Sequence, residues 1–362
     1  MQSLLLNNNT NLWKHLLIGA IFFRIVILII TFFIPIPFGP EPPISPLHFQ
    51  QGVDLAAYID AIPYFSSFVG LREMGLIYYE MIFLGVYPEV RPPGPIYSWF
   101  LMGLSYSAEN TVALSITIFV MESLTLFIWF NILKNQINLF SGLLLAVMPH
   151  SIWFGLLISS DIFIYFFSSL YFYIVLNHPS RFNRFVPLLC LLMVLSKPTG
   201  IVFCIGSLFL SRDYFKNNSE YFFSMFLITF ILFFSIIYYL PYFLVEQNVI
   251  ASNSELKEIS HAGTSVIKNI MKFFYVFGFH PSESKIFFAE IIRYFYGFFF
   301  VLGFFLSLNF NKTFAIIIIP SILMLVLFLV PSWRYILPFL PLFLVLGSNF
   351  FVKQLFKINI KK

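Results

Sequence analysis

Two carboxylates lie in the first polar stretch of an otherwise apolar chain. The segment QGVDLAAYIDAIPYF, residues 51–65, follows a long apolar run and contains Asp54 and Asp60. On a helix, Asp54 and Tyr58 share one face, whereas Asp60 points elsewhere. A carboxylate in a water-filled cleft can act as general base toward a hydroxyl. Asp54 is therefore the candidate catalytic residue, with Tyr58 and Asp60 beside it as candidate substrate contacts; the alternative is a solvated loop acid.

Several cations occupy unusual places along the same chain. Arg91 begins RPPGP, whose prolines stiffen the start of the next apolar stretch. Lys197 interrupts an apolar stretch within SKPTG, and Arg334 lies in PSWRYILPFLPL beside Tyr335. Guanidinium and ammonium groups suit phosphate oxygens, so these residues are candidate contacts for a phosphate headgroup. The alternative for each arginine is anchoring of a helix at the membrane interface.

Arg293, in AEIIRYFYG, is a further candidate for a phosphate contact. Its alternative partner is Glu290, one helical turn earlier. The histidines of the segment 245–285 have no companion at tight metal-ligand spacing, so no metal ligands are predicted, although divalent metal use stays open. The chain contains no Walker loop and no G-x-S-x-G element, which argues against cytosolic nucleotide chemistry.

The elements that must position these groups are membrane helices. Of 362 residues, 59% are hydrophobic and 10% are charged, whereas a soluble domain has about 25% charged residues. The formal net charge of +5 is read as the positive charge of cytoplasmic loops, and no nucleic-acid partner is predicted. The first apolar run contains Arg24 and lacks a small-residue cleavage pattern, which favours a retained anchor over a signal peptide.

The pattern predicts an all-α polytopic membrane protein with roughly 9–11 transmembrane or re-entrant helices, since about 20 apolar residues cross a bilayer. Residues 95–107 are too short for an ordinary crossing, and SKPTG divides 185–210 into two short helices or one broken helix. The clearest spans are 16–36, 111–133, 139–158, 161–177, 221–244, 286–308, 313–330 and 335–352.

The basic connections predict the orientation of these helices. If they are cytoplasmic, both termini lie inside, and the segments with isolated charges or helix-breaking prolines share the outer face. These basic residues are Lys14, Lys134, Arg181, Arg184, Arg212, Lys216, Lys312 and the tail from Lys353 to Lys362. The chain is then one membrane domain, 1–362, with external loops at about 36–94 and 245–285. Polar groups at membrane depth line a cavity or are buried in protein, so we expect one cavity at the outer leaflet.

The ordered set VDLAAYIDA, RPPGPIYSWF, MPHSIWFGLLISSDIFIYFF, LSKPTG and WRYILPFLPL resembles the GT-C superfamily of membrane glycosyltransferases. It is most similar to the branch of protein mannosyltransferases and aminoarabinose transferases. The resemblance implies a multispanning enzyme in the plasma (inner) membrane. Such an enzyme takes a sugar from a polyprenyl-phosphate donor at the non-cytoplasmic face and transfers it to a glycan, lipid or protein.

The resemblance also implies roles for individual residues. Asp54 matches the acidic residue of the family's first external loop, and Arg91 begins a segment like the proline-rich start of its second helix. Asp161 matches a polar turn that takes part in the site, and Arg334 with Tyr335 matches a late Arg-Tyr pair. The chain departs from the family in its acids, because Asp54 and Asp60 are not adjacent. Two alternatives remain open, a glycolipid transporter or flippase and a noncatalytic subunit of a glycan-assembly complex.

Overall fold

A computed structural model of the chain describes residues 11–33, 95–103, 111–156, 161–178, 182–214, 222–237, 273–274, 277, 287–328 and 333–360. Every element in these ranges is a helix, which confirms the all-α prediction. The elements are α2 (Leu12–Phe33), α6 (Pro95–Gly103), α7 (Thr111–Ile132), α8 (Leu139–Ala146), α9 (Pro149–Leu156), α10 (Asp161–Asn177), α11 (Phe182–Ser196), η4 (Pro198–Gly200), α12 (Ile201–Tyr214), α16 (Phe287–Phe310), α17 (Lys312–Phe328), η5 (Trp333–Phe339) and α18 (Leu340–Ile360). A further helix covers Phe222–Ile237.

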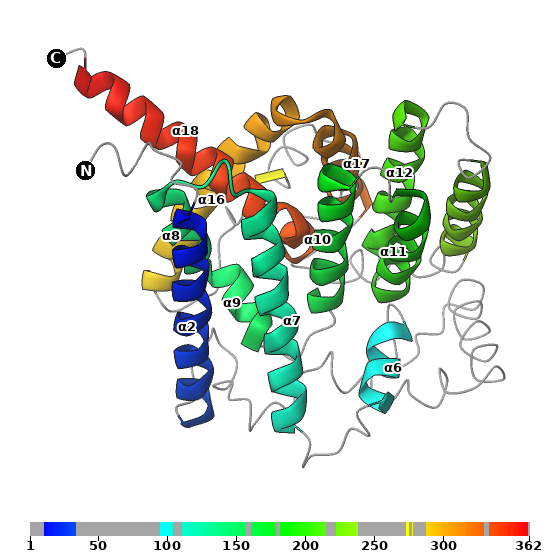
Figure 1. Cartoon of the computed structure of the whole chain (residues 1–362), viewed down its shortest axis with the longest axis horizontal. Helices are drawn as coiled ribbons and strands as arrows, with labels where there is room; N and C mark the ends of the chain where they lie inside the picture. The colour runs from blue at the N-terminus through cyan, green and yellow to red at the C-terminus, as the bar shows by residue number, and fades with distance from the viewer. Residues whose placement is uncertain are drawn as a thin grey trace, which may run out of the picture.

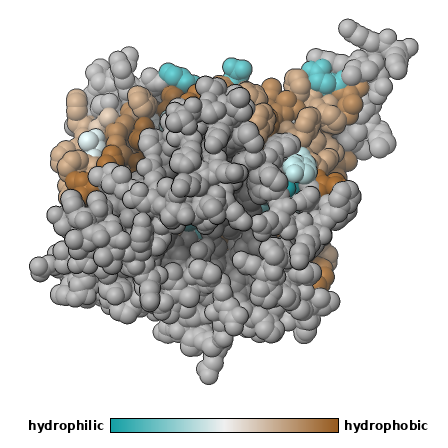
Figure 2. Space-filling view, turned by 180° about the vertical axis from the view of Figure 1, so that it is seen from behind, coloured by the Kyte–Doolittle hydropathy of each residue, from teal (hydrophilic) through white to brown (hydrophobic). Residues whose placement is uncertain are grey.

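Four helices of the described part are long and apolar enough to cross a membrane. Their apolar segments are Leu12–Ile30, Ser115–Ile132, Ile291–Phe310 and Ile336–Leu355, and each overlaps a span expected from the sequence. The other apolar helices are shorter than 18 residues. The helix 222–237 presents a row of exposed phenylalanines, among them Phe222, Phe226 and Phe233. Figure 2 shows apolar residues in a broad band over the upper part of one face, as expected where lipid replaces water.

The first two long helices pack antiparallel. The Cδ1 atom of Leu16, near the start of α2, fills the place where a side chain on Gly142 would lie, beyond the end of α7. Trp129 of α7 and Phe172 of α10 are in ring contact at 5.7 Å, which sets α10 beside α7. In Figure 1, α2, α7 and α10 stand side by side, while α16 and α18 run at a slant to them.

The stretch 185–210 is divided at SKPTG into two short helices, as the sequence predicts, and these form a hairpin. The helices α11 and α12 meet at Lys197 and the short η4, and they run antiparallel because Cys190 Sγ lies 3.4 Å from Ser207 Oγ. A side chain on Gly200 would lie 2.4 Å from the backbone carbon of Met193, so this tight approach requires glycine. Proline and glycine at the turn therefore bring the start of α12 against the end of α11.

The expected span 139–158 is interrupted, because the segment is broken into α8 and α9. Asn138 caps α8 by accepting a hydrogen bond from the amide of Ser141 at 2.8 Å. Pro149 is the first residue of α9, and it has no amide hydrogen to donate to the carbonyl of Leu145. The break leaves carbonyl groups at the end of α8 that need donors from other helices.

The helices α16 and α18 cross in close backbone contact. A side chain on Gly303 would lie 1.8 Å from the backbone oxygen of Phe343, and one on Gly347 would lie 2.3 Å from that of Phe299. Small residues at a crossing let two helices approach this closely, as in many membrane bundles. Of the apolar segment Ile336–Leu355, which includes the first part of α18, 83% is buried.

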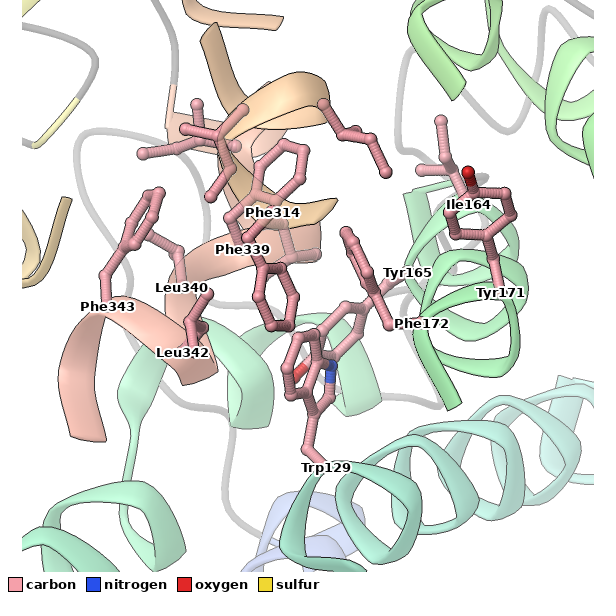
Figure 3. Packing of buried hydrophobic residues seen from close by; sticks show 14 of the residues in the cluster. Trp129, Ile164, Tyr165, Tyr171, Phe172, Phe314, Phe339, Leu340, Leu342 and Phe343 are labelled. Atoms are coloured by element: carbon pink, nitrogen blue, oxygen red, sulfur yellow. The ribbon is translucent and has the colours of Figure 1, made fainter. Parts of the chain in front are cut away.

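The aromatic core surrounds Phe172 (Figure 3). Its ring contacts those of Trp129 at 5.7 Å, Phe314 at 4.9 Å and Phe339 at 5.8 Å. These rings come from α7, α17 and η5, and Phe203 of α12 joins them at 5.9 Å. The edge-to-face and tilted arrangements are those that aromatic quadrupoles favour. One cluster of rings therefore fixes α10 against four other elements.

Candidate functional site

Lys197 and Asp161 form a buried ion pair. The Nζ atom of Lys197 donates a hydrogen bond to Oδ1 of Asp161, and the two residues are 6% and 0% exposed. Asp161 is the first residue of α10, where a carboxylate is stabilised by the positive end of the helix dipole. Lys197 follows α11 directly and precedes the turn η4. The helix start and the helix break therefore bring together two residues that the sequence predicts separately as site residues.

The short helix α6 lies near this pair. The ring of Phe100 packs edge-on against that of Phe163, two residues after Asp161, at 5.1 Å. The beginning of α10, the turn of the α11–α12 hairpin and α6 thus gather at one end of the helices. The exposed Lys14 and Lys134 lie near the opposite end, because Leu16 meets Gly142 there.

A second buried ion pair joins α2 and α7. The Nε atom of Arg24 donates to both carboxylate oxygens of Glu122, at 3.0 and 3.1 Å. The side chains are 2% and 1% exposed. Each residue lies near the middle of its helix, where an unpaired charge in lipid costs about 2.5–3.5 kcal/mol or more. The two charges therefore compensate each other inside the helix bundle.

Side chains also supply the donors that the broken α8–α9 segment lacks. Arg24 Nη1 donates to the backbone oxygen of Ala146, the last residue of α8, and to that of Ala20 at 3.3 Å. The hydroxyl of Tyr296 lies 3.2 Å from the oxygen of Leu144 and 3.4 Å from that of Val147. A cation and a hydroxyl thus face the negative end of α8, as the helix dipole favours.

Glu122 connects this break to α9 and α10. The hydroxyl of Ser151, in the first turn of α9, donates to Oε1 of Glu122. Tyr165 of α10 lies within electrostatic range of Glu122 and Arg24, and its buried hydroxyl has no hydrogen-bond partner among the described residues. Tyr165 is four residues after Asp161, so both lie on one face of α10, about 6 Å apart along its axis. The two polar clusters are therefore neighbours along α10.

The structure places the other predicted site residues as follows. The guanidinium of Arg293 lies over the ring of Tyr294 at 5.0 Å, and the side chain of its predicted partner Glu290 lies outside the described part. Arg334 and Tyr335 belong to η5, a 3-10 helix that precedes α18, and their side chains are not among those described. Asp54, Tyr58, Asp60 and Arg91 lie outside the described residues, as do most of the predicted external loops.

The sequence reasoning missed the Arg24–Glu122 pair. The presence of Arg24 distinguishes an anchor from a signal peptide, but no partner is predicted for Arg24 or for Glu122. The signal was present, since each is the sole charged residue of its predicted span, 16–36 or 111–133. Ionisable residues inside a span mark functional or paired positions by default. Pairing the two spans by their lone opposite charges would have predicted this contact.

The chemistry of the Asp161–Lys197 pair follows from its donors and acceptors. An ammonium has three N–H donors and a carboxylate accepts at two oxygens. The pair therefore combines a group that suits an anionic oxygen with a group that suits an N–H or O–H donor. Within the described residues, no group of three or more His, Cys, Asp and Glu side chains is arranged to hold a metal ion.

Comparison of the chain with protein-family models, with curated proteins and with solved structures finds no match. The geometry of the described helices and the sequence pattern therefore carry the functional argument.

Proposed function

We propose that the chain is a multi-pass plasma-membrane glycosyltransferase with a GT-C-like architecture. It transfers a sugar from a polyprenyl-phosphate donor to a glycan, lipid or protein acceptor at the non-cytoplasmic face. The observation that carries this proposal is the buried Asp161–Lys197 pair beside α6. Three of the sequence segments on which the resemblance rests contribute to this region.

In the proposed mechanism, cationic side chains bind the donor phosphate and one carboxylate acts as general base. Lys197, with Arg91, Arg293 and Arg334 as further candidates, binds the phosphate of the donor and stabilises the charge that develops as the lipid phosphate leaves. Asp54 takes the proton of the attacking hydroxyl, and Tyr58, Asp60 and Tyr335 contact the substrates. Asp161 fixes the direction of the Lys197 ammonium through its hydrogen bond.

The exposed apolar helices support the membrane location. The bundle presents phenylalanine, isoleucine and leucine side chains outward on α2, α7 and the helix 222–237. In lipid these side chains need no further protein cover. In water, so much exposed apolar surface would promote aggregation. A lipid-linked donor diffuses in the same phase and can reach the site laterally.

A direct transfer assay tests the proposal. The purified protein in lipid nanodiscs is incubated with a panel of polyprenyl-phosphate sugars, each labelled in the sugar, and with extracted envelope glycans, lipids and proteins as acceptors. We expect one donor to label one acceptor class with release of the polyprenyl phosphate. If intact protein binds the donors but transfers sugar from none of them, the proposed glycosyltransferase activity is rejected.

One observation favours a second candidate, the glycolipid transporter. Broken helices beside charged residues are typical of transporters, and the break between α8 and α9 lies beside Arg24 of α2 and Glu122 of α7. The charge on Glu122, however, is already matched by Arg24, which leaves little for a coupling ion. Proteoliposomes containing a fluorescent polyprenyl-phosphate sugar separate the two, because a transporter moves the lipid between leaflets without cleaving the sugar.

A further inference from the structure

Arg24 occupies a place that is built to receive a cation. Its guanidinium lies between the carboxylate of Glu122 and the backbone oxygen of Ala146 at the end of α8. In broken membrane helices, a carboxylate and the carbonyls at the end of a half-helix are the ligands that bind a free cation. Here the cation is attached to α2.

The remaining acceptors of the break are already occupied. Tyr296 donates toward the oxygens of Leu144 and Val147, and among the described residues the guanidinium donates to Glu122, Ala146 and Ala20. The Nη2 atom of Arg24 is buried and has no hydrogen-bond partner among the described residues. The guanidinium is therefore held mainly by its attraction to the Glu122 carboxylate, whose two oxygens both accept from Nε, while its hydrogen-bonding capacity is only partly used.

We propose that Arg24 is a tethered cation that holds the α8–α9 break and acts as a positioning residue for the start of α10. Hydrogen bonds connect Arg24 to Glu122 and Glu122 to Ser151 of α9, and Tyr165 of α10 lies within electrostatic range of Glu122 and Arg24. Tyr165 lies one turn from Asp161 on the same face, so we expect α10 to couple the break to the Asp161–Lys197 pair. Only the consequence for sugar transfer rests on the proposed function.

The proposal predicts chemical rescue by a free cation. Arg24→Ala leaves Glu122 buried without its partner, and we expect a lower Tm of the purified protein in detergent. The vacated place then binds the guanidinium ion itself, because the carboxylate and the Ala146 carbonyl remain. We expect guanidinium at millimolar concentration to raise the Tm of this variant with a saturable dependence, whereas equal sodium chloride does not.

Two matched variants separate this effect from unspecific stabilisation. Leu126→Ala removes a fully buried side chain one turn from Glu122 on α7 and leaves the ion pair intact. Its Tm also falls, and guanidinium must not raise it. In Arg24→Ala/Glu122→Ala the carboxylate is absent, and rescue must disappear. Rescue of either control, or no rescue of Arg24→Ala, overturns the tethered-cation role.

If Arg24→Ala does not yield folded protein, Glu122→Gln carries the test. The amide keeps the shape of the carboxylate but leaves the guanidinium without a counter-charge, so the Tm must fall. A wild-type Tm for Glu122→Gln would overturn the proposal.

The coupling to α10 has its own readout. In Arg24→Ala, hydrogen–deuterium exchange at the amides of the first two turns of α10 should increase, and guanidinium should reverse the increase. Leu126→Ala at equal loss of Tm should not show this local change. If exchange at α10 stays at the wild-type level, Arg24 does not position Asp161. These measurements do not involve sugar transfer, so they remain decisive if the proposed enzyme activity fails.

Discussion

Lys197 donates to Asp161 across 36 residues of sequence, and both side chains are buried where a helix break meets a helix start. The two residues therefore behave as one unit, and substituting them singly differs from substituting them together.

We expect Lys197→Met to destabilise the protein by about 3–5 kcal/mol, because it leaves the carboxylate of Asp161 buried and unpaired. The double variant Asp161→Asn/Lys197→Met removes both charges and should recover a large part of that loss. Unfolding in mixed detergent micelles measures the stabilities of the wild type, Lys197→Met, Asp161→Asn and the double variant as a double-mutant cycle. Additive losses would show that the two side chains do not interact.

The crossing of α16 and α18 predicts a strong effect of one methyl group. Gly303→Ala places a Cβ atom 1.8 Å from the backbone oxygen of Phe343, so the helices must separate. Overpacking of this kind costs about 1–3 kcal/mol. Gly19→Ala on α2 is the matched control, because nothing lies within 4 Å of the added atom. Thermal unfolding should show a lower Tm for Gly303→Ala and an unchanged Tm for Gly19→Ala.

The role of Asp54 is tested by Asp54→Asn beside Asp60→Asn. A general base contributes about 10²–10⁴-fold in rate, so the first variant should lose most turnover and still bind donor. Asp60→Asn should be much milder, because its side chain points away from the helical face of Asp54 and Tyr58. Single-turnover transfer and donor binding are measured together. Wild-type turnover by Asp54→Asn would place the base elsewhere.

Arg334→Lys tests the phosphate contact. An ammonium cannot reproduce the two-donor contact of a guanidinium with phosphate, so donor affinity should decrease while the fold is kept. Arg334→Ala should decrease it further. If both variants bind the donor like the wild type, Arg334 anchors its helix at the interface and Arg91 becomes the next residue to test.

The orientation of the chain is tested by cysteine accessibility in a background of Cys190→Ala and Cys204→Ala. Both native thiols are buried, so the substitutions remove reactive groups without altering the surface. Ala56→Cys, Ala262→Cys and Ser332→Cys should react with an impermeant thiol reagent added outside, whereas Phe182→Cys should not. The reverse pattern would place the basic connections outside.

The sequence by itself determined the features that arise from local chemistry. Apolar content and run length gave the all-helical architecture, since a backbone in lipid must satisfy its own hydrogen bonds. The hairpin at SKPTG was predictable because Pro198 lacks an amide hydrogen and Gly200 permits close approach. The break at Pro149 followed the same rule, but its surroundings were apolar enough to be taken for one span.

Only the tertiary structure decided which charges meet. Glu122 lies 98 residues from Arg24. The sequence pattern of each helix does not indicate which other helix packs against it. The partner depends on which helices pack together, and close packing at sites such as Gly142 and Gly303 sets that arrangement. Burial then makes the pairing obligatory, because an isolated charge inside the bundle has no water to solvate it.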